Sequence, residues 1–139
     1  MGRRYEVEVP IRWSDMDAYG HVNNARTLTL LEEARVSWLF LDAESLGLQR
    51  LASGIVVAAL GIRYRRPIDY RDRLVVSMGV QDLRASSFEI DYQVTVPAAQ
   101  ERDRLVVTAT STMVPVDPQT FRARRFEPHE RAWLETYRS

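Results

Sequence analysis

The sequence predicts an α+β domain in which a curved antiparallel sheet of five or six strands wraps around one long central helix. Three observations lead to this fold class. One strand-like segment precedes the only long helical candidate, and about five strand-like segments follow it. The connections between the later segments are short, which favours antiparallel neighbours. The 139 residues contain no repeat, low-complexity tract or linker, so we expect a single domain over residues 1–139.

The first strand is predicted for residues 5–13, because apolar and polar residues alternate there with a period of two. Pro10 lies within this pattern and has no backbone N–H to donate, which suggests an edge position in the sheet. A polar loop, residues 15–21, follows and contains Gly20. The strand and the loop therefore lead directly into the long helix.

The long helix is predicted for residues 24–41, with Asn23 or Asn24 as its N-cap, because an asparagine side chain can accept from early backbone N–H groups. Gly47 marks a predicted stop. Residues 38–41 are apolar all round, which predicts that the far end of the helix is buried on every side. The expected apolar face consists of Ala25, Leu28, Leu31, Trp38 and Leu41, and the expected polar stripe of Arg26, Thr29, Glu33 and Ser37.

The rest of the chain is typical of strands separated by turns, with breaks at Pro67 and Asp117-Pro118. The predicted strands are 55–66, 74–81, 88–96, 105–116 and 121–126, followed by a short helix over 128–137. One helix covers only part of such a sheet. The apolar surface left exposed predicts association with a second copy of the chain.

Composition excludes several classes of function. All 19 basic residues are arginine and 19 acidic residues balance them, which argues against nucleic-acid binding through bulk charge. Without cysteine or lysine there is no thiolate nucleophile and no Schiff-base chemistry. The two histidines, His21 and His129, form no metal-binding pair. No 18-residue apolar run and no secretory signal are visible, so we expect a cytoplasmic protein without a membrane partner.

The strongest chemical signal lies between the first strand and the helix, in the segment Asp15-Met16-Asp17-Ala18-Tyr19-Gly20-His21-Val22-Asn23-Asn24. The first N–H groups of a helix have no partner within it and carry partial positive charge, so they suit a developing oxyanion. The Asp17 carboxylate would lie close to them, and Gly20 would let the backbone turn tightly. A base or nucleophile beside an oxyanion site is the minimum for acyl transfer. From the residues alone, an aspartate that caps a turn is the simpler interpretation of Asp17.

Three separated motifs resemble those of the hot-dog-fold acyl-CoA thioesterases, the group of 4-hydroxybenzoyl-CoA thioesterase and its relatives. They are the segment 13–25 with H-V-N-N-A-R at 21–26, then L-E-E-A-R at 31–35, then Y-R-R-P at 64–67. The bacterial long-chain acyl-CoA thioesterase branch is the most similar in pattern. The resemblance covers essentially the whole chain and implies the hot-dog fold.

The resemblance also implies that the protein hydrolyses an acyl-CoA thioester to a carboxylic acid and coenzyme A. Asp17 falls on the family's catalytic aspartate, which acts either as a general base for water or as a nucleophile. The backbone N–H of Asn24 falls where the family polarises the thioester carbonyl. Gly20 matches the loop glycine, and His21 matches the pattern of the branch. The family needs no metal or organic cofactor, since coenzyme A is part of the substrate, and places its active sites at the interface of a homodimer or homotetramer.

The candidate substrate-binding residues follow from the chemistry of coenzyme A. A guanidinium fork suits phosphate oxygens, so Arg63, Arg65 and Arg66 are candidates for the CoA phosphates, with a solvated strand end as the alternative. Ser87 is a candidate for a pantetheine or phosphate contact, with a turn at the start of a strand as the alternative.

Other roles stay open on the sequence. A hydratase or dehydratase of acyl thioesters would use His21 with a carboxylate, and a non-catalytic protein would bind acyl-CoA or an acyl carrier without hydrolysis. Asp15 is expected to order the loop or to pair with an arginine. Glu32 and Arg35 are expected to pair across one helical turn, and Glu33 is expected to be solvated.

Overall fold

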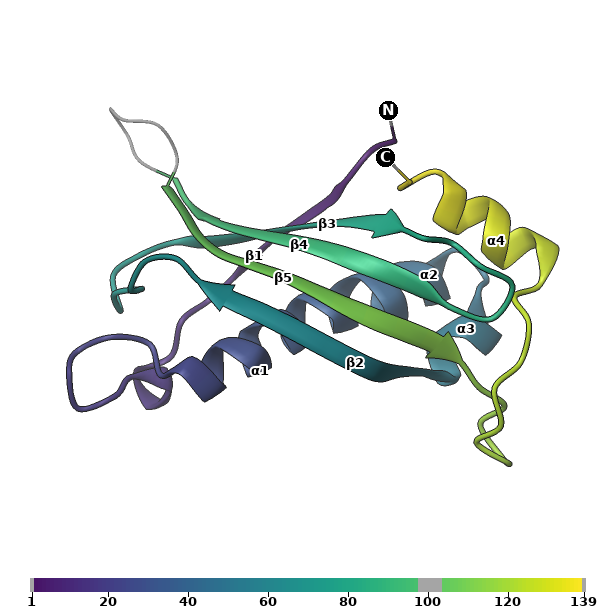
Figure 1. Cartoon of the computed structure of the whole chain (residues 1–139), viewed down its shortest axis with the longest axis horizontal. Helices are drawn as coiled ribbons and strands as arrows, with labels where there is room; N and C mark the ends of the chain where they lie inside the picture. Colours follow the sequence, from purple (N-terminus) through teal and green to yellow (C-terminus); the bar gives the residue numbers. More distant parts are fainter. Residues whose placement is uncertain (1, 98–103, 139) are drawn as a thin grey trace.

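The computed structural model describes residues 2–97 and 104–138, which form a five-stranded antiparallel sheet in the order β1-β3-β4-β5-β2. Figure 1 shows this sheet curving over a long helix, with β2 along one free edge. The strands are β1 (Tyr5–Val9), β2 (Ile55–Tyr64), β3 (Leu74–Gln81), β4 (Phe88–Val96) and β5 (Arg104–Pro115). The predicted fold class, a curved antiparallel sheet around one helix, is confirmed.

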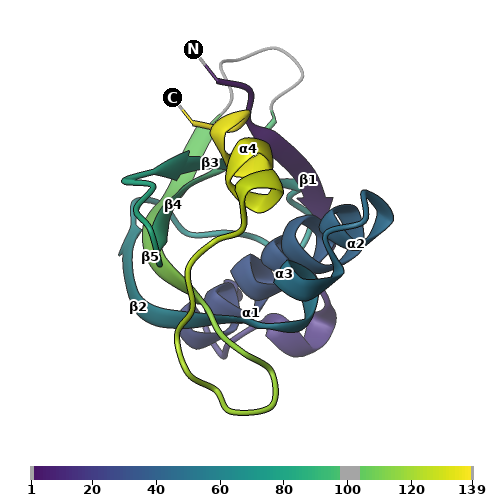
Figure 2. The same cartoon turned by 90° about the vertical axis from the view of Figure 1, so that its right-hand side faces the viewer.

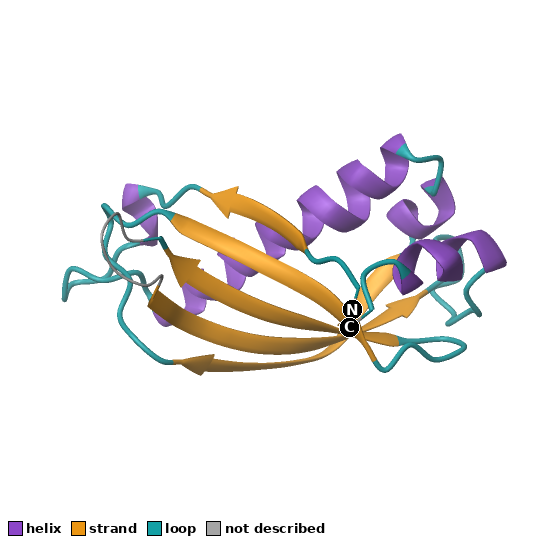
Figure 3. Ribbon diagram, turned by 90° about the horizontal axis from the view of Figure 1, so that it is seen from above, coloured by secondary structure: helices purple, strands orange, loops and turns teal. Residues whose placement is uncertain are grey.

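The long helix runs from Asn24 to Ser45 without a break, although its hydrogen bonding changes along the way. It consists of α1 (Asn24–Arg35), a π segment (Val36–Asp42) and α2 (Ala43–Ser45). Figure 2 shows the sheet wrapped around α1, and Figure 3 shows the helix running across one face of the sheet. The shorter helices are a 3-10 turn (Trp13–Asp15), α3 (Gln49–Ser53) and α4 (Pro128–Glu135). Within residues 2–97 and 104–138, no helix has the length and apolar character needed to cross a membrane.

The alternation along the strands separates a buried inner face from a polar outer face. On β4, Phe88 and Tyr92 are fully buried, whereas Asp91 between them is partly exposed. The register sets Phe88 opposite Met113 and Tyr92 opposite Ala109, so the inner residues of β4 and β5 lie on the same face. This inner face packs against the helix and forms the core.

Trp38 stands at the centre of this core and connects three separate elements. Its ring lies 5.8 Å from the rings of Tyr5 and Trp133 and 5.0 Å from the ring of Tyr137. Its side chain is fully buried. Aromatic pairs at these separations add to the stabilisation from burial itself, so Trp38 joins the helix to β1 and to the C-terminal segment.

The first strand is shorter than predicted. β1 ends at Val9, since Pro10 cannot donate to the ladder, and the chain leaves the sheet there. Trp13 is not a strand residue but begins a 3-10 turn, with 74% of its surface exposed. The alternation of apolar and polar residues in the sequence therefore extends beyond Val9, the last residue of β1 that pairs with β3.

The predicted burial of residues 38–41 on every side is wrong. Trp38 and Leu39 are buried, but Phe40 and Leu41 are exposed, Leu41 over 64% of its surface. The π segment is the physical reason, because its i→i+5 hydrogen bonds rotate the following side chains relative to an α-helix. Ala25 and Leu28 of the expected apolar face, near the start of the helix, are also exposed. The Asn23 cap and the stop at Gly47, with its positive φ of 82°, are confirmed.

The predicted strand over residues 121–126 is absent, and the strand predicted for 55–66 ends at Tyr64. Within residues 121–126, only an isolated bridge joins Ala123 to Val116, because the chain turns at Asp117 and Phe121 adopts a positive φ of 58°. A turn so soon after β5 leaves too little extended chain for a ladder. The terminal helix predicted for 128–137 is confirmed as α4.

A buried ion pair fixes α4 against the end of the sheet. The Arg124 guanidinium donates from Nη1 and Nη2 to the two carboxylate oxygens of Glu130, each at 2.8 Å, and the Glu127 N–H donates to the same carboxylate. Burial raises the pKa of Glu130, but these hydrogen bonds and the arginine charge outweigh burial and hold the pKa below its ordinary 4.5. The charged form of Glu130 therefore stabilises the fold.

Glu130→Ala should lower the free energy of unfolding by about 3–5 kcal/mol, because it leaves the Arg124 charge buried without its partner. The stabilisation by Glu130 is complete above its unfolded pKa near 4.5 and is lost as the pH falls through the lower folded pKa, so the variant should lack this acid-dependent step. Urea unfolding between pH 3 and pH 7 measures both effects. Glu135→Ala, which removes an exposed ion pair with Arg138, is the control and should cost about 0–1 kcal/mol.

Candidate active site

The loop before the helix is held in a closed shape by its own backbone and by Asp17. Met16 and Val22 pair as an isolated bridge, and the Asp17 N–H donates to the His21 carbonyl at 2.8 Å. Asp17 Oδ1 accepts from the N–H groups of Tyr19 at 2.8 Å and His21 at 3.2 Å. Gly20 has a positive φ of 81°, which the tight return requires. One oxygen of Asp17 therefore shapes the loop, while no hydrogen bond to Oδ2 is found among residues 2–97 and 104–138.

Asp15 anchors the base of this loop. Its fully buried carboxylate accepts from the Arg12 N–H at 2.8 Å and lies 3.2 Å from the Arg12 guanidinium, while its carbonyl accepts from the Asn23 N–H. Burial raises the pKa of Asp15, but the hydrogen bonds and charge of Arg12 outweigh burial and hold it below its ordinary 3.8. The expectation that Asp15 orders the loop and pairs with an arginine is confirmed.

Within the described part of the chain, the start of α1 presents one unpaired backbone N–H, that of Asn24, at the base of the loop. The Asn23 side chain caps the helix, since its Oδ1 accepts from the N–H groups of Ala25 at 2.8 Å and Arg26 at 3.4 Å. Asn24 is the first helical residue, and its N–H donates to no group in the part of the chain that the structure describes. Tyr64, the last residue of β2, donates its hydroxyl to the Asn24 carbonyl at 2.6 Å. This hydrogen bond ties the helix start to the end of the edge strand.

Two cavities lie near this helix start. A cavity of about 610 Å³ is lined by Asp17, Gly20, Asp69 and the aromatic pair Trp13–Tyr70. A smaller cavity, of about 280 Å³, is lined by Asn24, Thr27, Tyr64, Arg65, Arg66 and neighbouring residues. Asp17 and Asn24 thus belong to one short segment but line different cavities of a single chain.

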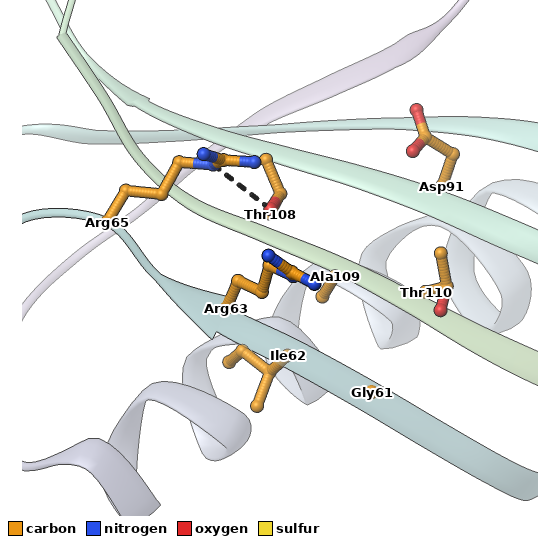
Figure 4. Close-up of a pocket in the computed structure, with 8 residues that line it drawn as sticks. All are labelled: Gly61, Ile62, Arg63, Arg65, Asp91, Thr108, Ala109 and Thr110. Atoms are coloured by element: carbon orange, nitrogen blue, oxygen red, sulfur yellow. Dashed lines mark hydrogen bonds between the residues drawn. The ribbon is translucent and has the colours of Figure 1, made fainter.

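The arginine candidates lie at the end of β2. Arg63 and Arg65 line a hollow of about 460 Å³ on the outer face of the sheet, where Arg65 Nε donates to Thr108 Oγ1 at 3.3 Å (Figure 4). Arg65 and Arg66 also line the cavity beside Asn24. The three arginines are therefore grouped near the helix start.

Ser87 is not brought to this group within one chain. It precedes Phe88, which pairs with Met113 and through it with Val57 near the start of β2, whereas the helix start lies at the opposite end of β2. The turn interpretation fits its surroundings, since the Ser87 carbonyl accepts from the Arg84 N–H.

Among the described residues, His21 is hydrogen-bonded to Asp17 only through its backbone, and Glu32 and Glu33 form no hydrogen bond with Asp17. The partly exposed His21 ring lies 3.9 Å, from Nε2 to Oδ1, from Asp69 across the loop. Glu32 Oε2 lies 3.9 Å from Arg35 Nη2, as the helical spacing predicts, and Glu33 is exposed. Two residues to which the sequence analysis assigned no role belong to this region, Tyr64 as a tether of the helix start and Tyr70 as a partner of Trp13. Tyr64 had a signal in the sequence, since it begins the Y-R-R-P motif.

The curved antiparallel sheet around one long helix is a hot-dog fold, and the similar proteins identify the class as thioester hydrolases. The sequence profile of the thioesterase-like superfamily matches residues 11–134, and the chain belongs to that family.

Relatives with known names agree with this assignment. The long-chain acyl-CoA thioesterase FadM of Escherichia coli strain K12 is 33% identical over 132 residues, covering 94% of this chain and 96% of FadM. The crystal structure of YbaW, a probable thioesterase from Escherichia coli, superposes with a TM-score of 0.77 at 32% identity, covering 96% of this chain and 98% of YbaW. A 4-hydroxybenzoyl CoA thioesterase mutant complexed with 4-hydroxybenzoyl CoA shares the fold, with a TM-score of 0.77 at 18% identity over 95% of this chain and 98% of its own.

Asp15→Asn should lower the free energy of unfolding by about 1–3 kcal/mol, because a buried amide group replaces a carboxylate that accepts from the backbone N–H and the guanidinium of Arg12. Asp15 stabilises the fold above its unfolded pKa, and this contribution disappears as the pH falls through its lower folded pKa. Urea unfolding at pH 7 and pH 3 checks the size and the sign. A loss equal at both pH values would contradict the assignment.

Proposed function

We propose that this protein hydrolyses acyl-CoA thioesters to the carboxylic acid and coenzyme A, with Asp17 as general base or nucleophile. The observation that carries the proposal is the position of Asp17. It lies on a loop whose base is hydrogen-bonded to the N-cap of α1, and only one of its oxygens is engaged by that loop. The free oxygen can accept a proton from water or attack the thioester carbon. The relatives named above support the substrate class.

The reaction needs one further group, a donor for the carbonyl oxygen. When water attacks the thioester carbon, its proton passes to Asp17, the C–S bond breaks, and the thiolate of coenzyme A leaves and is protonated. The negative charge on the carbonyl oxygen is stabilised by the Asn24 N–H and the partial positive charge of the helix N-terminus. Gly20 gives the loop its turn, and His21 holds Asp17 through its backbone. The proposed chemistry uses no metal or organic cofactor.

We further propose that two copies complete the site by pairing through β2. Several side chains of this edge strand are exposed, including Val57, Leu60 and Tyr64. An isologous antiparallel pairing turns the partner's β2 end for end, so its start lies against this chain's Tyr64. The helix start, with Asn24, then faces the partner, and a groove between the subunits can join the cavities that one chain keeps apart. Two such dimers could form a tetramer.

The coenzyme A moiety is proposed to lie along the end of β2. Arg65 and Arg66 border the cavity of Asn24, and Arg63 extends the cationic surface over the outer face. Guanidinium groups bind phosphate oxygens through paired hydrogen bonds, which suits the phosphates of coenzyme A. Since Ser87 lies at the other end of the sheet, any contact from it would come from the partner subunit.

Asp17→Asn should reduce kcat for acyl-CoA hydrolysis by about 10²–10⁴, because the amide can keep the loop hydrogen bonds but cannot act as base or nucleophile. A thiol-release assay over acyl-CoAs of increasing chain length measures this. Asp117→Asn is the matched control, because Asp117 Oδ1 also accepts from two backbone N–H groups of its own turn, and Asp117 lines neither cavity at the helix start. Equal activities of the two variants would make Asp17 a turn cap and remove its proposed role.

Leu60→Glu should convert the dimer to a monomer and abolish most of the activity, because pairing about the middle of β2 places two such carboxylates close together at the seam. Leu60 is 36% exposed. The control is Leu105→Glu on β5, where the leucine is 37% exposed and lies off this edge. Light scattering after gel filtration reports the mass of each variant. A Leu60→Glu protein that stays dimeric and active would rule out the β2 seam.

A further inference from the structure

A cavity distinct from those of the loop lies between the long helix and β2. Its volume is about 310 Å³. Most of its lining is apolar, and Arg35 and Glu32 are its charged residues. The apolar lining residues are Val36, Leu39, Phe40, Ile55, Val57 and Met113. The size and the lining suit a short acyl group.

The Arg35 guanidinium is buried beside this cavity with little to neutralise it. Arg35 is 8% exposed, and among the described residues its side chain makes one hydrogen bond, from Nη1 to the Tyr92 hydroxyl at 3.2 Å. Burial raises the pKa of Tyr92 above its ordinary 10, although the nearby Arg35 lowers it, so the phenol is neutral and supplies no counter-charge. Glu32 lies 3.9 Å away and its side chain is 65% exposed. One hydrogen bond and one weak ion pair leave most of the five guanidinium donors without a protein acceptor within residues 2–97 and 104–138, and these donors keep some contact with the cavity or solvent, where a further acceptor can reach them.

The π segment begins immediately after Arg35 and supplies one wall of the cavity. Val36, Leu39 and Phe40 all belong to it. A π segment has poorer hydrogen bonding than an α-helix and occurs frequently at functional sites. Here it turns Phe40 out of the core to an exposed position beside β2. The helix is therefore irregular at the point where the cavity and the buried cation meet.

The cavity also has a route to the reacting centre, which rests on the proposed function and its β2 seam. Ile55 and Val57, at the start of β2, line the cavity, whereas Tyr64 at the other end of β2 holds the helix start. Antiparallel pairing brings the partner's Tyr64 end, and with it the partner's helix start, beside Ile55. A thioester held at the partner's helix start would then extend its acyl group toward Arg35.

We propose that this cavity receives the acyl group and that Arg35 binds a carboxylate at the end of that group remote from the thioester. The preferred substrates are then ω-carboxyacyl-CoA thioesters of short to medium length. A carboxylate matches the planar guanidinium fork and supplies the counter-charge that the core lacks. Glu32, being largely exposed, can turn into solvent when the substrate carboxylate arrives.

The test compares kcat/KM for three thioesters of equal length, hexanedioyl-CoA, 6-hydroxyhexanoyl-CoA and hexanoyl-CoA. Wild-type protein should prefer hexanedioyl-CoA over hexanoyl-CoA by about tenfold or more, the size of one hydrogen-bonded charge contact. Arg35→Met should lose this preference while retaining hexanoyl-CoA hydrolysis, and Arg35→Lys should retain part of it. Arg122→Met, which removes an exposed arginine of the turn after β5 that does not line the cavity, should keep the full preference.

The ratio between substrates separates binding from a merely structural role, because a structural role would lower all three activities together. The proposal is overturned if wild-type protein does not prefer hexanedioyl-CoA, if the hydroxyl substrate is preferred instead, or if a folded Arg35→Met protein keeps the preference. If circular dichroism shows that Arg35→Met is unfolded, the same comparison of the three substrates is made with Arg35→Lys, which should retain only part of the wild-type preference. Hydrolysis of hexanoyl-CoA without a preference would leave the proposed function standing, whereas cleavage of no thioester would defeat both.

Discussion

The structure depends on one constraint, which is that a single long helix must cover the inner face of a sheet much larger than itself. The sheet curves around α1 because the inner residues of β4 and β5 and the rings about Trp38 must all reach the same helix. The curvature closes the fold on the side of β1, where Tyr5 stacks on Trp38. It leaves β2 as an edge with exposed residues. The site and the proposed seam both follow from this asymmetry, since the helix start lies at the end of that same edge.

Asp15 and Asp17 lie in the same loop but differ in burial, and this difference gives them different surroundings. Asp15 is buried, paired with Arg12 and connected by its carbonyl to the helix cap, so it holds the loop to the helix. Asp17 is partly exposed at a cavity wall, and one of its oxygens stays outside the loop's hydrogen bonds. The same residue type thus anchors the loop at one position and leaves a carboxylate oxygen free of the loop's hydrogen bonds at the other. The proposed role of Asp17 depends on this arrangement, because a rigid Asp15 keeps the loop that carries Asp17 in place.

The local sequence pattern predicted the strands whose side chains alternate between buried and exposed, and the helix ends that a capping residue determines. The ladders around Phe88 and Tyr92, the Asn23 cap and the terminal helix fall in this group. The pattern failed where hydrogen bonding, rather than polarity, decides the outcome: at Pro10, at the turn of Asp117, and in the π segment that exposes Leu41. For the site, the motif located Asp17 and Asn24, but their separation into two cavities and the tether from Tyr64 depend on tertiary contacts between residues about 40 positions apart.

The distribution of the three tryptophans gives the molecule an internal optical reporter. Trp38 and Trp133 are enclosed in the core, where their emission is insulated from the solvent, whereas Trp13 stands largely in water against the edge of Tyr70 at the wall of the Asp17 cavity. A change in polarity at that wall therefore alters the emission of a single exposed indole. Occupancy of the Asp17 cavity can thus be followed without any attached dye.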